Sequence, residues 1–290
     1  MIDAHHHLWD LNAVNYPWLM EKGKRRFFGD PTPIQRNYLI DEHIKLANEL
    51  GFKGSVHIQV GAADGLEEAQ WINSVVNENQ SWPMVQVAFC DLSSDQRELH
   101  LDKLQKLSSV VGVRQIIGRS PAEDANSKTN ELLTSDNFMQ GLQSISDRGL
   151  TFDLQIIPEL FKTCATVFSQ FPNLQVILCH AGSPYNRTLG GIKSWADDLI
   201  HLSNLSNVSC KLSGLGMFDH NWTGSTVAPI VTTVMDQFGS KRVMFGSNFP
   251  VDSLSSSFEQ LFTRLSSNID EKDFEDVFSK TAQRIYFSNF

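Results

Sequence analysis

The feature that most constrains the fold is a regular alternation between short β-rich runs and stretches with helical spacing. Between the first two runs, for example, Leu39, Ile40, Ile44, Ala47 and Leu50 are apolar at helical intervals. The β-rich runs fall at residues 1–7, 54–60, 84–90, 110–117, 150–156, 174–180, 207–212 and 242–246. Such alternation predicts parallel strands joined by helical crossovers. Eight units without a break in composition predict an α/β fold in which residues 1–290 form one domain, a (β/α)8 TIM barrel.

Charge and composition narrow the classes of partner. The formal net charge is −9, and nucleic-acid binding requires a cationic surface, so we expect a small-molecule substrate and no nucleic acid. The chain starts without the cationic and apolar segments of a signal peptide, and no apolar run approaches the roughly 20 residues of a membrane span. We therefore expect a cytoplasmic enzyme with four reduced cysteines and no membrane partner. The oligomeric state stays open, a homodimer being one option.

A long non-helical insertion follows the first β-rich run. Residues 11–36 are rich in aromatic residues, proline and Lys/Arg. Active sites of barrel enzymes lie at the C-terminal ends of the strands, so this segment is expected to cover the mouth of the barrel. Trp18 is its main candidate for contact with a substrate.

The first cluster of candidate residues is His5, His6 and His7 in IDAHHHLWD. Side chains alternate along a strand, so His5 and His7 are expected to point to one side and His6 to the other. Two imidazoles on one side can bind one divalent metal, although an H-x-H pattern also occurs by chance. His180 ends the apolar run of VILCHAGSP and would complete a three-nitrogen Zn²⁺ site. Taken alone, a histidine in that position could equally be structural.

The last β-rich run ends in RVMFGSNFPVD, where Asn248 and Asp252 are candidates for catalysis. A carboxylate at this position would act as a general base on water. Asn248 cannot take up a proton at neutral pH but can orient a water or ligate weakly. Asp252 could supply the carboxylate, or could instead cap the helix that follows.

Several other polar residues lie at or near the ends of predicted strands. Each has an alternative role in packing or at the surface, and a buried cation among them would need a neighbouring or bound anion. The candidates for substrate binding, besides Trp18, are His57, Gln59, Arg114, Arg119, Asp153, Gln155, Lys211, His220 and Trp222.

Taken together, these segments resemble the amidohydrolase-related TIM-barrel hydrolases, and within them a sugar-lactonase branch that includes fuconolactonase, rhamnonolactonase and pyrone-dicarboxylate lactonase. The resemblance rests on IDAHHHLWD, GVRQIIG, VILCHAGSP, VSCKLSGLGMFDHNW and RVMFGSNFPVD and covers essentially the whole chain. It implies hydrolysis of a cyclic ester, with a divalent metal, expected to be Zn²⁺, at His5, His7 and His180. Many relatives carry an aspartate where this chain has Asn248, so the identity of the base is open, and a metal-free mechanism is compatible with the resemblance.

The expected mechanism is attack of water on the carbonyl of a lactone, with His180 or Asp252 as the base. Lys211 or Arg114 would stabilise the oxyanion. One alternative is a metal-dependent decarboxylase of a small conjugated acid on the same barrel. A second, from another class, is a non-catalytic sugar-acid binding protein, which the presence of Asn248 suggests. A serine hydrolase is not expected, because G-S-N-F-P lacks the second glycine of a nucleophile elbow.

Overall fold

The computed structural model describes residues 1–288 and contains one eight-stranded parallel sheet in which each strand pairs with the next along the chain. The strands are β1 (Asp3–His6), β2 (Ser55–Ile58), β3 (Met84–Ala88), β4 (Val110–Val113), β5 (Thr151–Leu154), β6 (Val176–Leu178), β7 (Val208–Leu212) and β8 (Val243–Phe245). The ring closes between β1 and the segment that follows β8. There the Asn248 amide donates to the His5 carbonyl at 2.7 Å, and the His7 amide donates to the Phe249 carbonyl at 2.7 Å.

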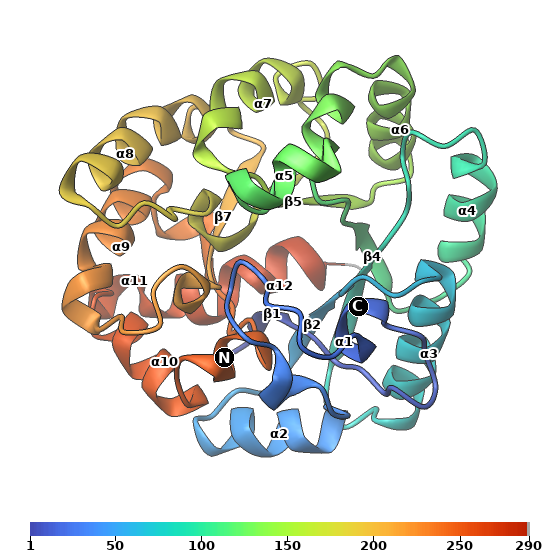
Figure 1. Cartoon of the computed structure of the whole chain (residues 1–290), viewed down its shortest axis with the longest axis horizontal. Helices are drawn as coiled ribbons and strands as arrows, with labels where there is room; N and C mark the ends of the chain where they lie inside the picture. The colour runs from blue at the N-terminus through green and yellow to red at the C-terminus, as the bar shows by residue number, and fades with distance from the viewer. Residues whose placement is uncertain (289–290) are drawn as a thin grey trace.

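Helices surround this sheet, as expected for parallel strands with helical crossovers (Figure 1). They are α1 (Pro17–Met20), α2 (Ile40–Glu49), α3 (Gly65–Glu78), α4 (Arg97–Leu104), α5 (Pro121–Ser127), α6 (Asp136–Asp147), α7 (Phe161–Phe168), α8 (Leu189–Ser203), α9 (Gly224–Phe238), α10 (Phe258–Ser266), α11 (Glu271–Glu275) and α12 (Thr281–Tyr286). The segment that carries α1 lies across the inside of the helix ring in this view.

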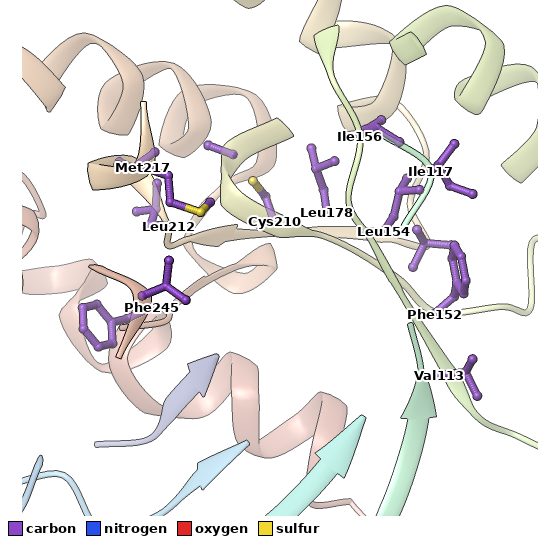
Figure 2. Packing of buried hydrophobic residues seen from close by; sticks show 14 of the residues in the cluster. Val113, Ile117, Phe152, Leu154, Ile156, Leu178, Cys210, Leu212, Met217 and Phe245 are labelled. Atoms are coloured by element: carbon purple, nitrogen blue, oxygen red, sulfur yellow. The ribbon is translucent and has the colours of Figure 1, made fainter. Parts of the chain in front are cut away.

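The alternation of side chains along the strands builds two apolar layers. Outward residues such as Phe152, Leu154 and Leu178 pack between the sheet and the helices (Figure 2). Inward residues of several strands, among them Val56 and Val85, form a smaller cluster inside the barrel. Tyr286 of α12 belongs to this inner cluster, so the C-terminal helix packs against the barrel interior.

The eight predicted strands and the barrel are confirmed. The four cysteines are free and buried, as predicted. Two local expectations are wrong. Residues 11–36, predicted to be non-helical, carry the short helix α1. Residues 124–131 have the polar composition of a loop, yet α5 extends through residue 127, because Ser120 caps its N-terminus and Pro121 occupies its first turn. In the described part of the chain, no helix is both long enough and apolar enough to cross a membrane.

Candidate active site at the C-terminal mouth of the barrel

A register shift in β1 sets the direction of the first histidines. Asp3 pairs with Ser55 and His6 pairs with His57, so β1 places one more residue in this interval than β2 does. Asp3 and His6 therefore both face outward, toward His43 of α2. His5 and His7 turn inward, and their ring centroids lie 5.1 Å apart. The predicted opposite orientation of His6 is thus confirmed.

The turns after β6 and β8 bring two further residues to the same place. His180 and Asn248 both adopt left-handed backbone conformations, with φ of 57° and 53°. Such conformations cost of the order of 1–3 kcal/mol each and persist where the surrounding structure enforces them. Because the left-handed turn interrupts the alternation of β6, the His180 ring faces inward, with its centroid 4.6 Å from that of His5. Histidines from the start and the middle of the chain therefore meet at one end of the barrel.

Beside these residues lies a pocket of about 270 Å³. Its lining residues are His7, Pro17, Trp18, Arg26, Phe27, Phe28, Val60, Gly61, Arg114, Ile116, Arg119, Gln155, His180, Met217, Asn248 and Val251. The segment 11–36 supplies the aromatic wall, as the sequence predicts. Trp18 is fixed there by a hydrogen bond from its Nε1 to the Val60 carbonyl at 2.6 Å. An aromatic wall facing a few polar groups is typical of small-molecule sites.

The charge of the pocket is opposite in sign to that of the whole chain. Arg26 is paired with Glu123 through two hydrogen bonds of 3.2 Å. Arg114, by contrast, contacts only neutral acceptors, the Gln59 carbonyl at 2.9 Å and the Gln155 side chain, and its Nε has no partner. The Arg119 guanidinium has no hydrogen-bond partner among residues 1–288. Burial lowers the pKa of both Arg114 and Arg119. Two arginines without a bonded carboxylate favour an anionic ligand.

His7, Asn248 and Asp252 form a chain of contacts at one side of the pocket. His7 Nδ1 lies 2.7 Å from the Ile58 carbonyl, and its Nε2 lies 3.2 Å from Asn248 Oδ1. Asn248 Nδ2 donates to Asp252 Oδ1 at 3.0 Å. Asp252 thus lies behind Asn248, outside the pocket lining, and burial raises its pKa to about 7. The alternative prediction that Asp252 caps the following helix is wrong, because Ser257 caps α10.

His180 is oriented from behind by the turn after β7. Its Nδ1 lies 3.0 Å from Ser213 Oγ, and Gly214 packs directly against the same ring edge. Burial, followed by the charge of Arg114, lowers the pKa of His180 well below its usual value, so the ring is neutral near pH 7. With Nδ1 occupied, Nε2 is the atom of His180 that is available to a ligand.

Asp153 and Lys211 lie inside the barrel but outside the pocket lining. Lys211 Nζ contacts Asp153 Oδ2 at 2.5 Å, and Tyr286 donates to Asp153 Oδ1 at 2.7 Å. All three side chains are buried. Each carboxylate oxygen of Asp153 therefore has a partner, and one of these partners, Tyr286, belongs to the C-terminal helix α12. Neither of these two predicted residues is placed to contact a substrate in the pocket directly.

Two sets of side chains could hold a divalent metal. His5, Asp153 and Cys179 bring ligand atoms within 4.8 Å of one another, and among the described residues only this group of His, Cys, Asp and Glu side chains does so. Both oxygens of Asp153, however, already have partners. The second set is His5, His7 and His180. His180 has an Nδ1 partner that leaves its Nε2 available, His7 Nε2 faces Asn248 Oδ1, and both His5 nitrogens are unpartnered. These imidazoles fit a metal chemically, although their ligand atoms do not all lie within 4.8 Å of one another.

The remaining predicted residues lie outside the pocket lining. His57 faces the helices and its Nε2 lies 3.6 Å from Glu68. Gln59 bonds backbone groups at Gly61 and Arg114. His220 donates to the Phe28 carbonyl at 2.7 Å and so holds the segment 11–36 from outside. Trp222 is buried beneath Arg264. Of the predicted binding residues, the structure places Trp18, Arg114, Arg119 and Gln155 on the pocket.

Arg26 and Phe28 are among the lining residues that were not singled out from the sequence. Both belong to the segment 11–36, whose aromatic and basic composition was the available signal. Their individual positions depend on long-range contacts, with Glu123 for Arg26 and with His220 for Phe28. No local pattern indicates such contacts.

Comparisons with known proteins agree with this architecture. The profile of the family described as Amidohydrolase matches residues 2–287. The uncharacterized protein y4mH of Sinorhizobium fredii is 32% identical over 266 residues, which cover 90% of this chain and 89% of that protein. An L-fucono-1,5-lactonase of Burkholderia multivorans is 23% identical, with 90% and 85% covered.

Two solved structures share the fold. An amidohydrolase from Burkholderia multivorans with bound zinc superposes with a TM-score of 0.84 at 20% identity, covering 99% of this chain and 98% of that one. A candidate 2-pyrone-4,6-dicarboxylic acid hydrolase from Pseudomonas putida gives a TM-score of 0.74 at 17% identity, with 100% and 98% covered.

Proposed function

Because the chain belongs to the amidohydrolase family, whose profile matches residues 2–287, we propose that it hydrolyses a small lactone that carries a carboxylate. The observation that carries this proposal is the pair Arg114 and Arg119, two pocket arginines without a bonded carboxylate. The lactonase and pyrone-dicarboxylic acid hydrolase among the similar proteins support the reaction class and an acidic substrate.

The pocket suggests how such a substrate binds. The substrate carboxylate pairs with the Arg119 guanidinium and the free Nε of Arg114, since a planar guanidinium matches a carboxylate. The lactone ring lies against the aromatic wall at Trp18 and Phe28. This orientation directs the ester carbonyl toward His7, Asn248 and His180.

The reaction then requires one proton acceptor and one anion stabiliser. Neutral His180 accepts the proton of water through Nε2 as the water oxygen attacks the carbonyl carbon. The positive charge of Arg114 in the pocket lining also stabilises the resulting oxyanion. When the tetrahedral intermediate collapses, the ring C–O bond breaks and the ring oxygen receives the proton held by His180. A divalent metal bound by His5 and His7 would add Lewis-acid polarisation of the carbonyl or of water.

An indicator assay of proton release tests the proposal. The full chain is screened against lactones with and without a carboxylate, and His180→Asn is the matched variant. We expect ring opening of the acidic lactones and a loss of about a hundredfold or more in His180→Asn, because the proton acceptor is removed. Carbon dioxide release from conjugated acids would identify a decarboxylase instead. Thermal stabilisation by sugar acids without any turnover would identify a binding protein.

A further inference from the structure

Of the three arginines that line the pocket, Arg26 has its guanidinium bound by a carboxylate of the chain. Its Nε and Nη2 each donate to Glu123 at 3.2 Å, one to each carboxylate oxygen. Arg114 bonds only neutral acceptors, and the Arg119 guanidinium has no hydrogen-bond partner among residues 1–288. The positive charge that a ligand can neutralise is therefore concentrated at Arg114 and Arg119.

The Arg26–Glu123 pair is oriented so that the arginine faces the pocket and the carboxylate does not. Arg26 belongs to the lining, whereas Glu123, in the first turn of α5, lies outside it. The guanidinium carbon lies 5.8 Å from the ring centroid of Trp18 and 6.0 Å from that of Phe28, and these ring contacts also hold the guanidinium at the aromatic wall. Both members of the pair are partly buried, so water screens their charges incompletely.

We propose that Glu123 is a specificity-determining residue, which restricts the pocket to lactones with one carboxylate because it neutralises Arg26. This inference rests on the proposed function, in which the single carboxylate of the substrate occupies Arg114 and Arg119. A second carboxylate on the ring would find only Arg26, and it would have to share that guanidinium with Glu123 or displace Glu123 from it. Sharing brings two negative charges together, and displacement breaks a bidentate pair, so both lower the affinity for a dicarboxylate.

Glu123 has a further contact that would also fit a purely structural role. Its Oε1 accepts a hydrogen bond from the Phe27 amide at 3.3 Å, so the residue ties the segment 11–36 to α5. If this tie were its only function, removal of the Glu123 charge would loosen the aromatic wall and weaken the binding of every ligand. If Glu123 sets specificity, the same change strengthens the binding of a dicarboxylate. The two roles therefore predict effects of opposite sign.

Calorimetry on the full chain measures the affinity for benzoate, which has one carboxylate, and for isophthalate, which has a second carboxylate on the same ring. Neither acid contains an ester, so the measurement does not depend on turnover. We expect the native chain to bind benzoate more tightly than isophthalate. In Glu123→Gln, which keeps the shape of the side chain, we expect the affinity for isophthalate to rise about 10- to 100-fold and that for benzoate to change less than about threefold, because a charged hydrogen bond to Arg26 is gained. The additional change Arg26→Gln should abolish this gain.

Glu131→Gln is the matched control, because it removes the same charge at an exposed residue outside the pocket lining, and it should leave both affinities near their native values. The proposal is overturned if Glu123→Gln weakens the binding of both acids or strengthens both equally, or if the gain survives the change at Arg26. It is equally overturned if the native chain binds neither acid, or binds isophthalate at least as tightly as benzoate. Failure to open any lactone would contradict the proposed function instead, and the ratio of the two affinities would still be measured.

Discussion

At the scale of single residues, the arginines that line the pocket differ in whether a carboxylate of the chain binds their guanidinium group. Arg26 is neutralised by Glu123, whereas the guanidinium of Arg119 has no hydrogen-bond partner in the described chain. Its position in the lining therefore suits recognition of the substrate rather than support of the fold. A charged hydrogen bond contributes about 1.5–3 kcal/mol, which corresponds to a substantial change in affinity.

We expect Arg119→Gln to raise KM for a carboxylated lactone about 10- to 100-fold, with a smaller change in kcat. A neutral lactone of the same ring size is the control, and its KM should change little. Steady-state kinetics on both substrates measure the difference. Equal effects on the two substrates would show that Arg119 does not bind the carboxylate.

Ser213 offers a second test at this scale, because its hydroxyl lies 3.0 Å from His180 Nδ1. Ser213→Ala removes the group that fixes the ring, and we expect kcat to fall about 10- to 100-fold with little change in KM. The pH profile of kcat should also shift, since the surroundings of His180 change. Ser209→Ala, at a buried serine within β7 itself, is the control and should retain native kinetics.

At the scale of elements, the turns that follow the strands decide where the candidate catalytic side chains point. Among positive-φ residues other than glycine, His180, Ala181 and Ser183 follow β6 and Asn248 follows β8, while Lys128 is elsewhere. The turn after β7 supports the one after β6, because Gly214 packs against the His180 ring. The site therefore depends on backbone conformations in connections as well as on the strands.

Gly214→Ala tests this dependence. A Cβ at Gly214 would lie 2.3 Å from His180 Nδ1, and φ is +62°. We expect a loss of activity of about a hundredfold and a loss of stability of roughly 1–3 kcal/mol. Gly23→Ala is the matched control, because Gly23 has φ of +77° but open space around it. For the control, thermal unfolding should show a loss of stability of about 1 kcal/mol from backbone strain, and kinetics should show native activity.

At the scale of the whole molecule, the barrel buries ionisable groups on its outer side as well. His43 of α2 stacks on His6 and lies 3.6 Å from Asp3, while His57 faces Glu68 of α3. Burial lowers the pKa values of His43 and His57 to about 3, and it raises the pKa of Glu68 to about 8. The contact between the sheet and these helices therefore requires neutral histidines.

The free energy of unfolding of the native chain should consequently depend on pH, because His43 must remain neutral in the folded state. Its folded pKa lies below the unfolded value of about 6.5, so its contribution is complete above that pH and is lost as pH falls toward 3. The difference in unfolding free energy between the native chain and His43→Gln should shrink by about 1.4 kcal/mol per pH unit in this window. Chemical denaturation at several pH values measures it. His201→Gln, at a surface position, should give a curve parallel to the native one.

The amino-acid sequence by itself determined the barrel, the segment over its mouth and the common direction of His5 and His7. These features depend on the periodicity of apolar residues and on the alternation of side chains along strands, both of which are local. His180, Arg114, Arg119 and Gln155 were predictable for the same reason, since each lies at or just beyond a strand end.

Only the tertiary structure decided which polar residues at the strand ends reach the pocket. His57 and Asp153 were indistinguishable from Gln155 in the sequence. In the structure, however, His57 lies on the outer side of the sheet beside Glu68, and Asp153 lies below the pocket, bound by Lys211 and Tyr286. Asp252 lies behind Asn248 because a left-handed turn follows β8. Such outcomes depend on partners that are distant in sequence and on the cost of burying an unpaired charge. Neither can be predicted from the local sequence pattern.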